Sequence, residues 1–224
     1  MTRSTDATPG GTLVLTAHPD STSLTHHAAR RLRDLLGPDD VTVAHLAQEG
    51  FDPRWTLADR RAYLGQATPG PDVLAEHRRV DQADHLVLVF PVQWWSLPAL
   101  LKGWVDRVLV AGWAFDLDED GTVVPRLQRL TVHLLPLSGT SAGSFDRHGY
   151  TRSFRTQLEQ GVVGYCGARA GVTAFVHDSE SGDREAVAAA VDRAAGSIAT
   201  SITGTATSTS SAGTTGAPVV AQEG

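Results

Sequence analysis

The sequence predicts a three-layer α/β sandwich built on a five-stranded parallel sheet. Short apolar runs rich in β-branched residues alternate with segments of helical periodicity, which is typical of parallel strands joined by crossover helices. These runs are apolar at nearly every position, as expected of strands that are buried on both faces. The composition agrees, because 41% hydrophobic and 20% charged residues are ordinary values for a folded globular chain.

Five runs are predicted as strands, at residues 12–17, 41–46, 85–90, 131–137 and 171–176. Helices are predicted at 23–36, 71–82, 97–110, 151–165 and 183–200. The first helix repeats Leu and Ala at helical spacing and is preceded by hydroxyl side chains that can cap its start. Five such strands most simply adopt the flavodoxin-like order 2-1-3-4-5, in which ligands bind beyond the carboxyl ends of the strands.

Composition also predicts the limits of the folded domain, which we place at residues 12–200. Residues 1–11 are polar and turn-rich, and residues 201–224 consist mainly of Ser, Thr, Gly and Ala, so both are expected to be flexible segments with too little apolar surface to order themselves. Neither a signal peptide nor a run of about 18 apolar residues is present, so we expect a cytoplasmic protein without stable membrane insertion.

Charge and cysteine usage exclude several classes of function. The formal net charge of -6 disfavours nucleic acid as a main partner. The single cysteine, Cys166, excludes an internal disulfide framework and fits a reducing cytoplasm. The histidines lack metal-ligand spacing, and the acidic residues 116–120 depart from calcium-loop spacing and are read as a solvated hairpin turn. We therefore expect no metal site.

The predicted strand order points to three loops. Residues 17–25 lead from a strand into a helix N-terminus and offer hydroxyls and N–H groups suited to a phosphate, although ordinary helix capping explains them as well. Residues 90–98 carry two adjacent tryptophans and Gln93, which suit stacking and hydrogen bonding to an extended aromatic ligand. The alternative is that Trp94 and Trp95 cover a domain edge or a subunit contact.

The third loop, residues 137–150, is glycine-rich and permits close backbone approach to a ligand. Gly139–Gly143 also matches the G-x-S-x-G pattern, which would make Ser141 the nucleophile of a serine hydrolase. That reading would need His177 as base and Asp146 as acid. We keep it as a minor alternative, because a flexible loop is expected here in place of the required strand-turn-helix.

Three motifs together resemble the flavin-dependent NAD(P)H quinone oxidoreductases of the DT-diaphorase and modulator of drug activity B type. They are A-H-P-x-x-x-S-L-T at 17–25, F-P-V-Q-W-W-S-L-P-A-L-L-K-G-W-V-D-R-V at 90–108 and G-W-A-F at 112–115. Residues 51–53 and 147–150 match the same pattern, and the resemblance covers residues 12–176. It implies a flavodoxin-like fold, FAD (alternatively FMN), NAD(P)H as co-substrate, a quinone or similar small aromatic acceptor reduced by two electrons in a ping-pong cycle, and a homodimer.

The resemblance also implies where a flavin would be held. The residues that would contact its phosphates are His18, Ser23, Leu24 and Thr25. Those that would line its isoalloxazine edge are Pro91, Val92, Gln93, Trp94 and Trp95. Those that would contact its pyrimidine end are Leu137, Ser138, Gly139, Thr140 and Phe145. Trp94 and Trp95 would also touch the substrate, and Phe115 matches an aromatic residue that closes the neighbouring subunit's pocket.

Two positions depart from the family pattern. Thr25 replaces a usual Asn, and Phe145 replaces a usual Tyr whose hydroxyl assists charge on the reduced flavin. His148 or Tyr150 is the expected catalytic replacement, with main-chain N–H groups at Gly139 and Thr140 as the alternative. The same fold and cofactor would also suit a redox-sensing ancillary subunit of a membrane transporter, the second class of function that we consider.

Overall fold

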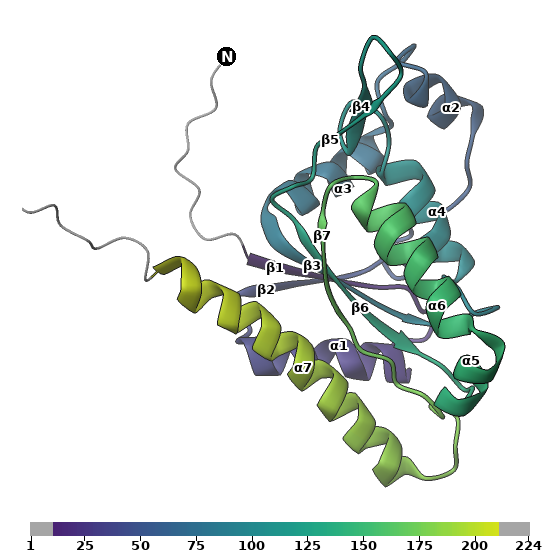
Figure 1. The fold of residues 1–224 in the computed structure, drawn as a ribbon, viewed down its shortest axis with the longest axis vertical. Helices are drawn as coiled ribbons and strands as arrows, with labels where there is room; N and C mark the ends of the chain where they lie inside the picture. Colours follow the sequence, from purple (N-terminus) through teal and green to yellow (C-terminus); the bar gives the residue numbers. More distant parts are fainter. Residues whose placement is uncertain (1–10, 211–224) are drawn as a thin grey trace, which may run out of the picture.

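A computed structural model describes residues 11–210 and contains a five-stranded parallel sheet in the order β2-β1-β3-β6-β7 (Figure 1). These strands are β1 Gly11–Thr16, β2 Val41–His45, β3 Ala83–Pro91, β6 Thr131–Leu137 and β7 Arg169–Thr173. Since β6 and β7 are the fourth and fifth strands of this sheet, the predicted order 2-1-3-4-5 is confirmed.

Helices cover both faces of the sheet. On one face lie α1 Leu24–Leu36 and α7 Arg184–Ser210; on the other lie α3 Pro71–Asp81, α4 Ala99–Val108 and α6 Tyr150–Arg155 (Figure 1). Alternate residues of β3 supply the two cores: Leu86 and Leu88 pack under α4, whereas Val87 and Val89 pack under α1 and α7. Burial on both faces explains why the strand is apolar from Leu86 to its end.

Short elements extend the sandwich at one end. Helix α2 Leu57–Tyr63 was not predicted, and β4 Phe115–Leu117 pairs with β5 Val123–Pro125 in an antiparallel hairpin. The carboxylate of Asp118 accepts hydrogen bonds from the N–H groups of Asp120 and Thr122 in the turn between them. The predicted hairpin is present, but Asp116 and Leu117 lie in β4 and the turn itself is formed by residues 118–122.

The region from 138 to 165 differs from the prediction. Residues 142–148, expected as a flexible loop, form helix α5 Ala142–His148, because Ser141 caps its start and Gly149 ends it in the left-handed conformation at φ 70°. The helix predicted at 151–165 consists of α6 followed by a π-helix, η1 Thr156–Gly164. The fifth strand begins at Arg169 and ends at Thr173, after which Val176 pairs with Leu137 in an isolated bridge.

The last helix crosses the predicted domain boundary at residue 200. Helix α7 continues to Ser210, and Ile202 is only 8% exposed because it packs in the core under α1 and α7. The remaining predicted flexible parts, residues 1–10 and 211–224, lie outside the described residues. Within the described range, none of the helices has the length and apolarity needed to cross a membrane.

Candidate functional site

The three predicted loops meet at the carboxyl edge of the sheet. They follow β1, β3 and β6, which are neighbours, and main-chain hydrogen bonds join them: Ala17 N–H donates to Val89 at 3.3 Å and Val92 N–H donates to Leu137 at 2.7 Å. The junction of β1 and β3 is the point where the strand order reverses. In doubly wound folds of this order the ligand lies at that switch point.

The first loop is a preformed cap on helix α1. Asp20 accepts hydrogen bonds from the N–H and hydroxyl of Thr22, which hold the pKa of its carboxyl below the ordinary value. Ser23 is the N-cap and accepts from the N–H of His26. Thr25 is buried, so among the residues predicted here its side chain offers no surface to a ligand, in contrast to His18 and Ser23.

The second loop contains a strained turn. Gln93 and Ser96 exchange two main-chain hydrogen bonds at 3.0 and 3.1 Å around Trp94 and Trp95, which have φ of 48° and 59°. Left-handed conformations at consecutive residues define a type I′ turn, which normally uses Asn and Gly. For residues with a side chain this conformation costs about 1–2 kcal/mol each, and it persists only where surrounding structure holds it.

The two tryptophans are held differently. The indole of Trp94 is 88% exposed. Trp95 stacks on Tyr150 with ring centroids 4.4 Å apart, and His148 stacks on Tyr150 at 5.3 Å. The predicted catalytic candidates His148 and Tyr150 therefore lie beside the second loop. Phe145, predicted to bind the cofactor, is fully buried and packs edge-to-face against Tyr150, so its side chain has no exposed surface.

The third loop is secured by the segment that follows the fifth strand, of which the sequence analysis singled out only His177, as the base of a hydrolase. Thr140 N–H donates to the Ser138 hydroxyl at 3.0 Å, Ser179 N–H donates to the Ser138 carbonyl at 2.9 Å, and His177 Nδ1 lies 3.1 Å from the Thr140 carbonyl. Leu137 and Ser138 are buried, so their side chains support the loop from below.

Glu180, in the same segment, reaches over Gly139. A Cβ atom at Gly139 would lie 2.9 Å from the carboxylate of Glu180. The signal that would have found this segment is its position: residues 176–181 follow the fifth strand, whose carboxyl end lies at the same edge of the sheet.

Ser141 has a structural role. It is the N-cap of α5 with φ -67° and ψ 153°, and its hydroxyl oxygen accepts from Ser144 N–H at 3.3 Å. A nucleophile elbow places its Ser on a sharp, strained turn, whereas this backbone is relaxed. His177, the histidine that the hydrolase would need, is engaged with the carbonyl of Thr140. The arrangement gives no support to the serine hydrolase alternative.

The donor set of this edge fits a polar, planar ring. Within the described residues, no protein acceptor engages the main-chain N–H groups of Trp94, Trp95 or Gly139. These donors come from the second and third loops, next to aromatic faces and beside the N-terminus of α1. Ring oxygens and nitrogens of a flavin are acceptors of the kind that such N–H groups stabilise, and its phosphate is of the kind that α1 stabilises.

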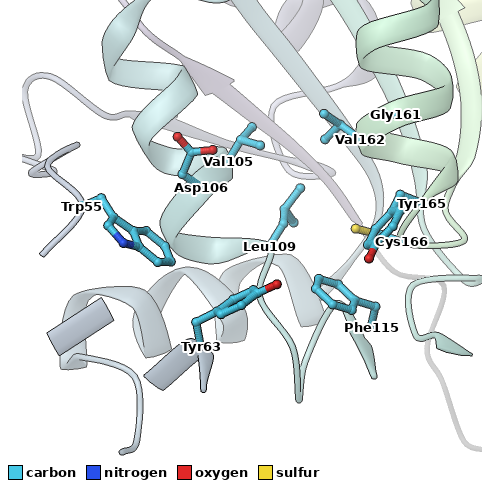
Figure 2. A pocket seen from close by; sticks show the side chains of 10 residues that line it. All are labelled: Trp55, Tyr63, Val105, Asp106, Leu109, Phe115, Gly161, Val162, Tyr165 and Cys166. Carbon is cyan, nitrogen blue, oxygen red and sulfur yellow. The ribbon is translucent and has the colours of Figure 1, made fainter. Parts of the chain in front are cut away.

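Phe115 lies away from these loops. Helix α4 begins directly after the second loop, and Phe115 follows its other end, which is about 15 Å further along the helix axis. There it contacts Tyr165 edge-on at 5.0 Å beside an open cavity of about 360 Å³. Figure 2 shows Trp55 and Tyr63 lining the same cavity. The sequence analysis did not single out Trp55, Tyr63 or Tyr165.

An ion-pair network centred on the buried side chain of Arg107 positions the segment that carries Trp55 and Tyr63. Arg107 of α4 donates to Asp59 at 3.0 Å, to Asp72 at 2.7 Å and to the carbonyl of Asp52 at 2.7 Å. Burial opposes ionisation of Asp59, but hydrogen bonds from Thr56 and Arg107 outweigh it, so the pKa of Asp59 lies below its ordinary value. The network fixes α2 against α4 on this face.

The fold is that of a doubly wound α/β protein, with three loops that converge at the carboxyl edge of the sheet. The chain belongs to the family described as having the flavodoxin-like fold, whose model matches residues 11–199. A mouse ribosyldihydronicotinamide dehydrogenase [quinone] is 32% identical over 150 residues, or 57% of this chain and 63% of the mouse protein. The chain thus matches less than two thirds of that relative's length.

Two solved structures show the same fold. An NAD(P)H:quinone oxidoreductase from Methanothermobacter marburgensis has a TM-score of 0.76 and 22% identity, covering 84% of this chain and 96% of that chain. An FMN-dependent NADH-azoreductase from Bacillus anthracis, in complex with FMN, has a TM-score of 0.64 and 18% identity, covering 86% of this chain and 99% of that chain.

Proposed function

We propose that this chain is a flavin-dependent oxidoreductase that takes a hydride from NAD(P)H and passes two electrons to a quinone or similar small aromatic acceptor. The observation that carries this proposal is the strained Trp94-Trp95 turn, with free N–H groups, at the switch point of the sheet. Strain of this kind is concentrated at functional sites. The names of the relatives support the same activity.

The proposed cofactor is FAD, with FMN as the alternative. FAD is favoured by the first-loop pattern at residues 17–25, whereas the azoreductase of similar fold holds FMN. When bound, the flavin accepts hydride from NAD(P)H and donates two electrons to the acceptor. Its phosphate would be held at the start of α1, and its ring would lie against the second and third loops. The residues are His18, Ser23 and Leu24; Pro91, Val92, Gln93, Trp94 and Trp95; and Gly139 and Thr140.

The side chains around the turn would orient the reactants and hold a proton. Trp94 and Trp95 supply flat faces that exclude water from the stacked rings. Main-chain N–H groups at Trp94, Trp95 and Gly139 would stabilise negative charge that develops on the ring edge. Tyr150 and His148, stacked beside Trp95, are the proposed groups that hold or donate a proton in place of the hydroxyl absent at Phe145.

We also propose that the enzyme is a homodimer in which Phe115 completes the partner's site. Phe115 lies at the opposite end of α4 from the second loop, so it cannot reach the loops of its own chain. In a two-fold symmetric dimer formed through the face that carries α4, the cavity beside Phe115 of one copy would lie over the three loops of the other copy. Symmetry would make the second site in the same way. Exposed apolar residues surround the cavity, including Trp55, Tyr63 and Tyr165, as expected of a surface that a second copy covers.

The test is to purify the full-length protein, record its visible spectrum and determine the mass of the released cofactor. A yellow protein that releases FAD and reduces menadione with NAD(P)H is the expected result. A colourless protein that takes up no added flavin would refute the proposal. Bound flavin with negligible turnover would refute the oxidoreductase and favour a redox-sensing subunit instead.

A further inference from the structure

The Gln93–Ser96 turn is anchored by a residue distant in sequence. The hydroxyl of Ser96 donates a hydrogen bond to Oε1 of Gln157 at 2.6 Å. Gln157 is the second residue of η1, just after the helix changes from α to π hydrogen bonding. Tyr150, which stacks on Trp95, is the first residue of α6, and α6 leads directly into η1. One helical segment therefore contacts the turn at both Trp95 and Ser96.

This anchoring matters because the turn is unfavourable by itself. Its two central residues are tryptophans at positive φ, in a turn type that prefers Asn and Gly. Tyr150 restrains the indole of Trp95, whereas Gln157 restrains Ser96, the residue whose main chain closes the turn. Without that second contact, the loop can exchange with conformations in which the tryptophans return to negative φ.

We propose that Gln157 is a positioning residue for the flavin ring. Through Ser96 it holds the Trp94-Trp95 turn in the conformation that leaves both N–H groups free for the ring edge. This inference rests on the proposed function, because it takes a flavin to be the ligand of those N–H groups. The change to a π-helix at this point agrees with it, since π-helical turns are frequent at functional sites.

The expected consequence is a change in flavin affinity rather than in folding. Gln157 is exposed and Ser96 is half-buried, and their hydrogen bond is open to solvent, so its loss leaves no buried polar atom and changes the Tm little. The apparent Kd for flavin equals the intrinsic Kd divided by the fraction of molecules in which the turn has its binding conformation. A smaller fraction therefore raises the apparent Kd. Gln157→Leu and Ser96→Ala should each raise the flavin Kd about three- to tenfold, as for one lost hydrogen bond.

The experiment strips flavin from the full-length protein and titrates FAD back while following fluorescence quenching. The double variant Ser96→Ala/Gln157→Leu should bind no more weakly than either single variant, because both remove the same bond. Gln157→Glu keeps an acceptor oxygen and should restore affinity. Gln160→Leu makes the same substitution at an exposed position of the same π-helix and should bind as the wild type does.

Unchanged Kd values in Gln157→Leu and Ser96→Ala, additive effects in the double variant, or an equal effect of Gln160→Leu would each overturn the inference while leaving the proposed function intact. A wild-type chain that binds no flavin would instead overturn the proposed function, and this inference with it.

Discussion

The ring of His133 lies fully buried with its Nε2 atom 3.2 Å from Nδ1 of His85. The main-chain N–H of Val172 donates to His133 Nδ1 at 3.0 Å, so that nitrogen carries no proton. Nε2 of His133 is therefore the donor, and Nδ1 of His85 is the acceptor. The two neutral imidazoles thus connect β3 to β6, and the hydrogen bond from Val172 connects β6 to the edge strand β7.

This pair predicts a stability loss in mild acid. Burial lowers the pKa of His133 from 6.5 to about 4, with the nearby His85 contributing. Below pH 6.5 the unfolded chain takes up a proton that the folded chain does not, so the free energy of unfolding falls as pH drops from about 6.5 to about 4. At about pH 5 the loss is on the order of 2 kcal/mol.

The measurement is the Tm from about pH 7.5 to pH 5 for the wild type and His133→Leu. The Tm of His133→Leu should fall less over this range than that of the wild type, whatever its value at neutral pH. The control His27→Leu, at an exposed site, should show the same fall as the wild type. Equal slopes in His133→Leu and the wild type would show that the acid sensitivity arises elsewhere.

Gly103 allows α4 to pack directly on the segment after β2. A Cβ atom at Gly103 would overlap the main chain of Pro53, so Gly103→Ala should lower the free energy of unfolding by about 1–3 kcal/mol through overpacking. The matched control is Gly196→Ala in α7, where the new methyl group would meet no atom within 4 Å beyond the adjacent backbone of its own helix. There the higher helix propensity of Ala should raise the free energy of unfolding by at most about 1 kcal/mol. Denaturant titration measures both, and a neutral Gly103→Ala would contradict the packing argument.

Ser141→Ala tests the capping role of Ser141. Loss of the N-cap should lower stability by about 1 kcal/mol, and flavin reduction by NAD(P)H should stay within a few-fold of the wild-type rate. A fluorophosphonate probe should label neither protein when intact masses are compared. Covalent labelling of the wild type that disappears in Ser141→Ala would instead support a nucleophilic serine.

Two truncations test the length of α7. Ending the chain after Thr200 removes the buried Ile202 and should lower the free energy of unfolding by about 1–3 kcal/mol, whereas ending it after Ser210 should change it little. Ile202→Ala in the full chain should reproduce part of the first effect. If both truncations melt like the full chain, the last helical turns do not contribute to stability.

The group that replaces the hydroxyl absent at Phe145 can be found by stopped-flow reduction with NAD(P)H. Tyr150→Phe keeps the ring that stacks on Trp95 and removes only the hydroxyl, so a rate loss of about 10- to 1000-fold at unchanged flavin content would assign the role to that hydroxyl. His148→Ala tests the neighbouring ring in the same way. Rates near wild type in both variants would assign the charge stabilisation to main-chain N–H groups.

Much of the fold follows from local pattern. The apolar runs of β1, β3 and β6 and the capped start of α1 were predicted because periodicity and capping depend on residues close in sequence. The strand order then places three loops at one edge. The α5 helix was missed because the glycine-rich composition of residues 137–150 favours a loop, whereas Ser141 and Gly149 delimit a helix that packs Phe145 into the core.

By itself, the sequence determined the strand order and, through it, the edge of the sheet at which the aromatic loop lies. Only the tertiary structure decided that Trp94 and Trp95 adopt positive φ, that Gln157 and Tyr150 anchor their turn, that residues 176–181 secure the third loop, and that α7 continues past residue 200. The physical reason is that these features depend on hydrogen bonds and packing between residues far apart in the chain, and local periodicity carries no information about such contacts.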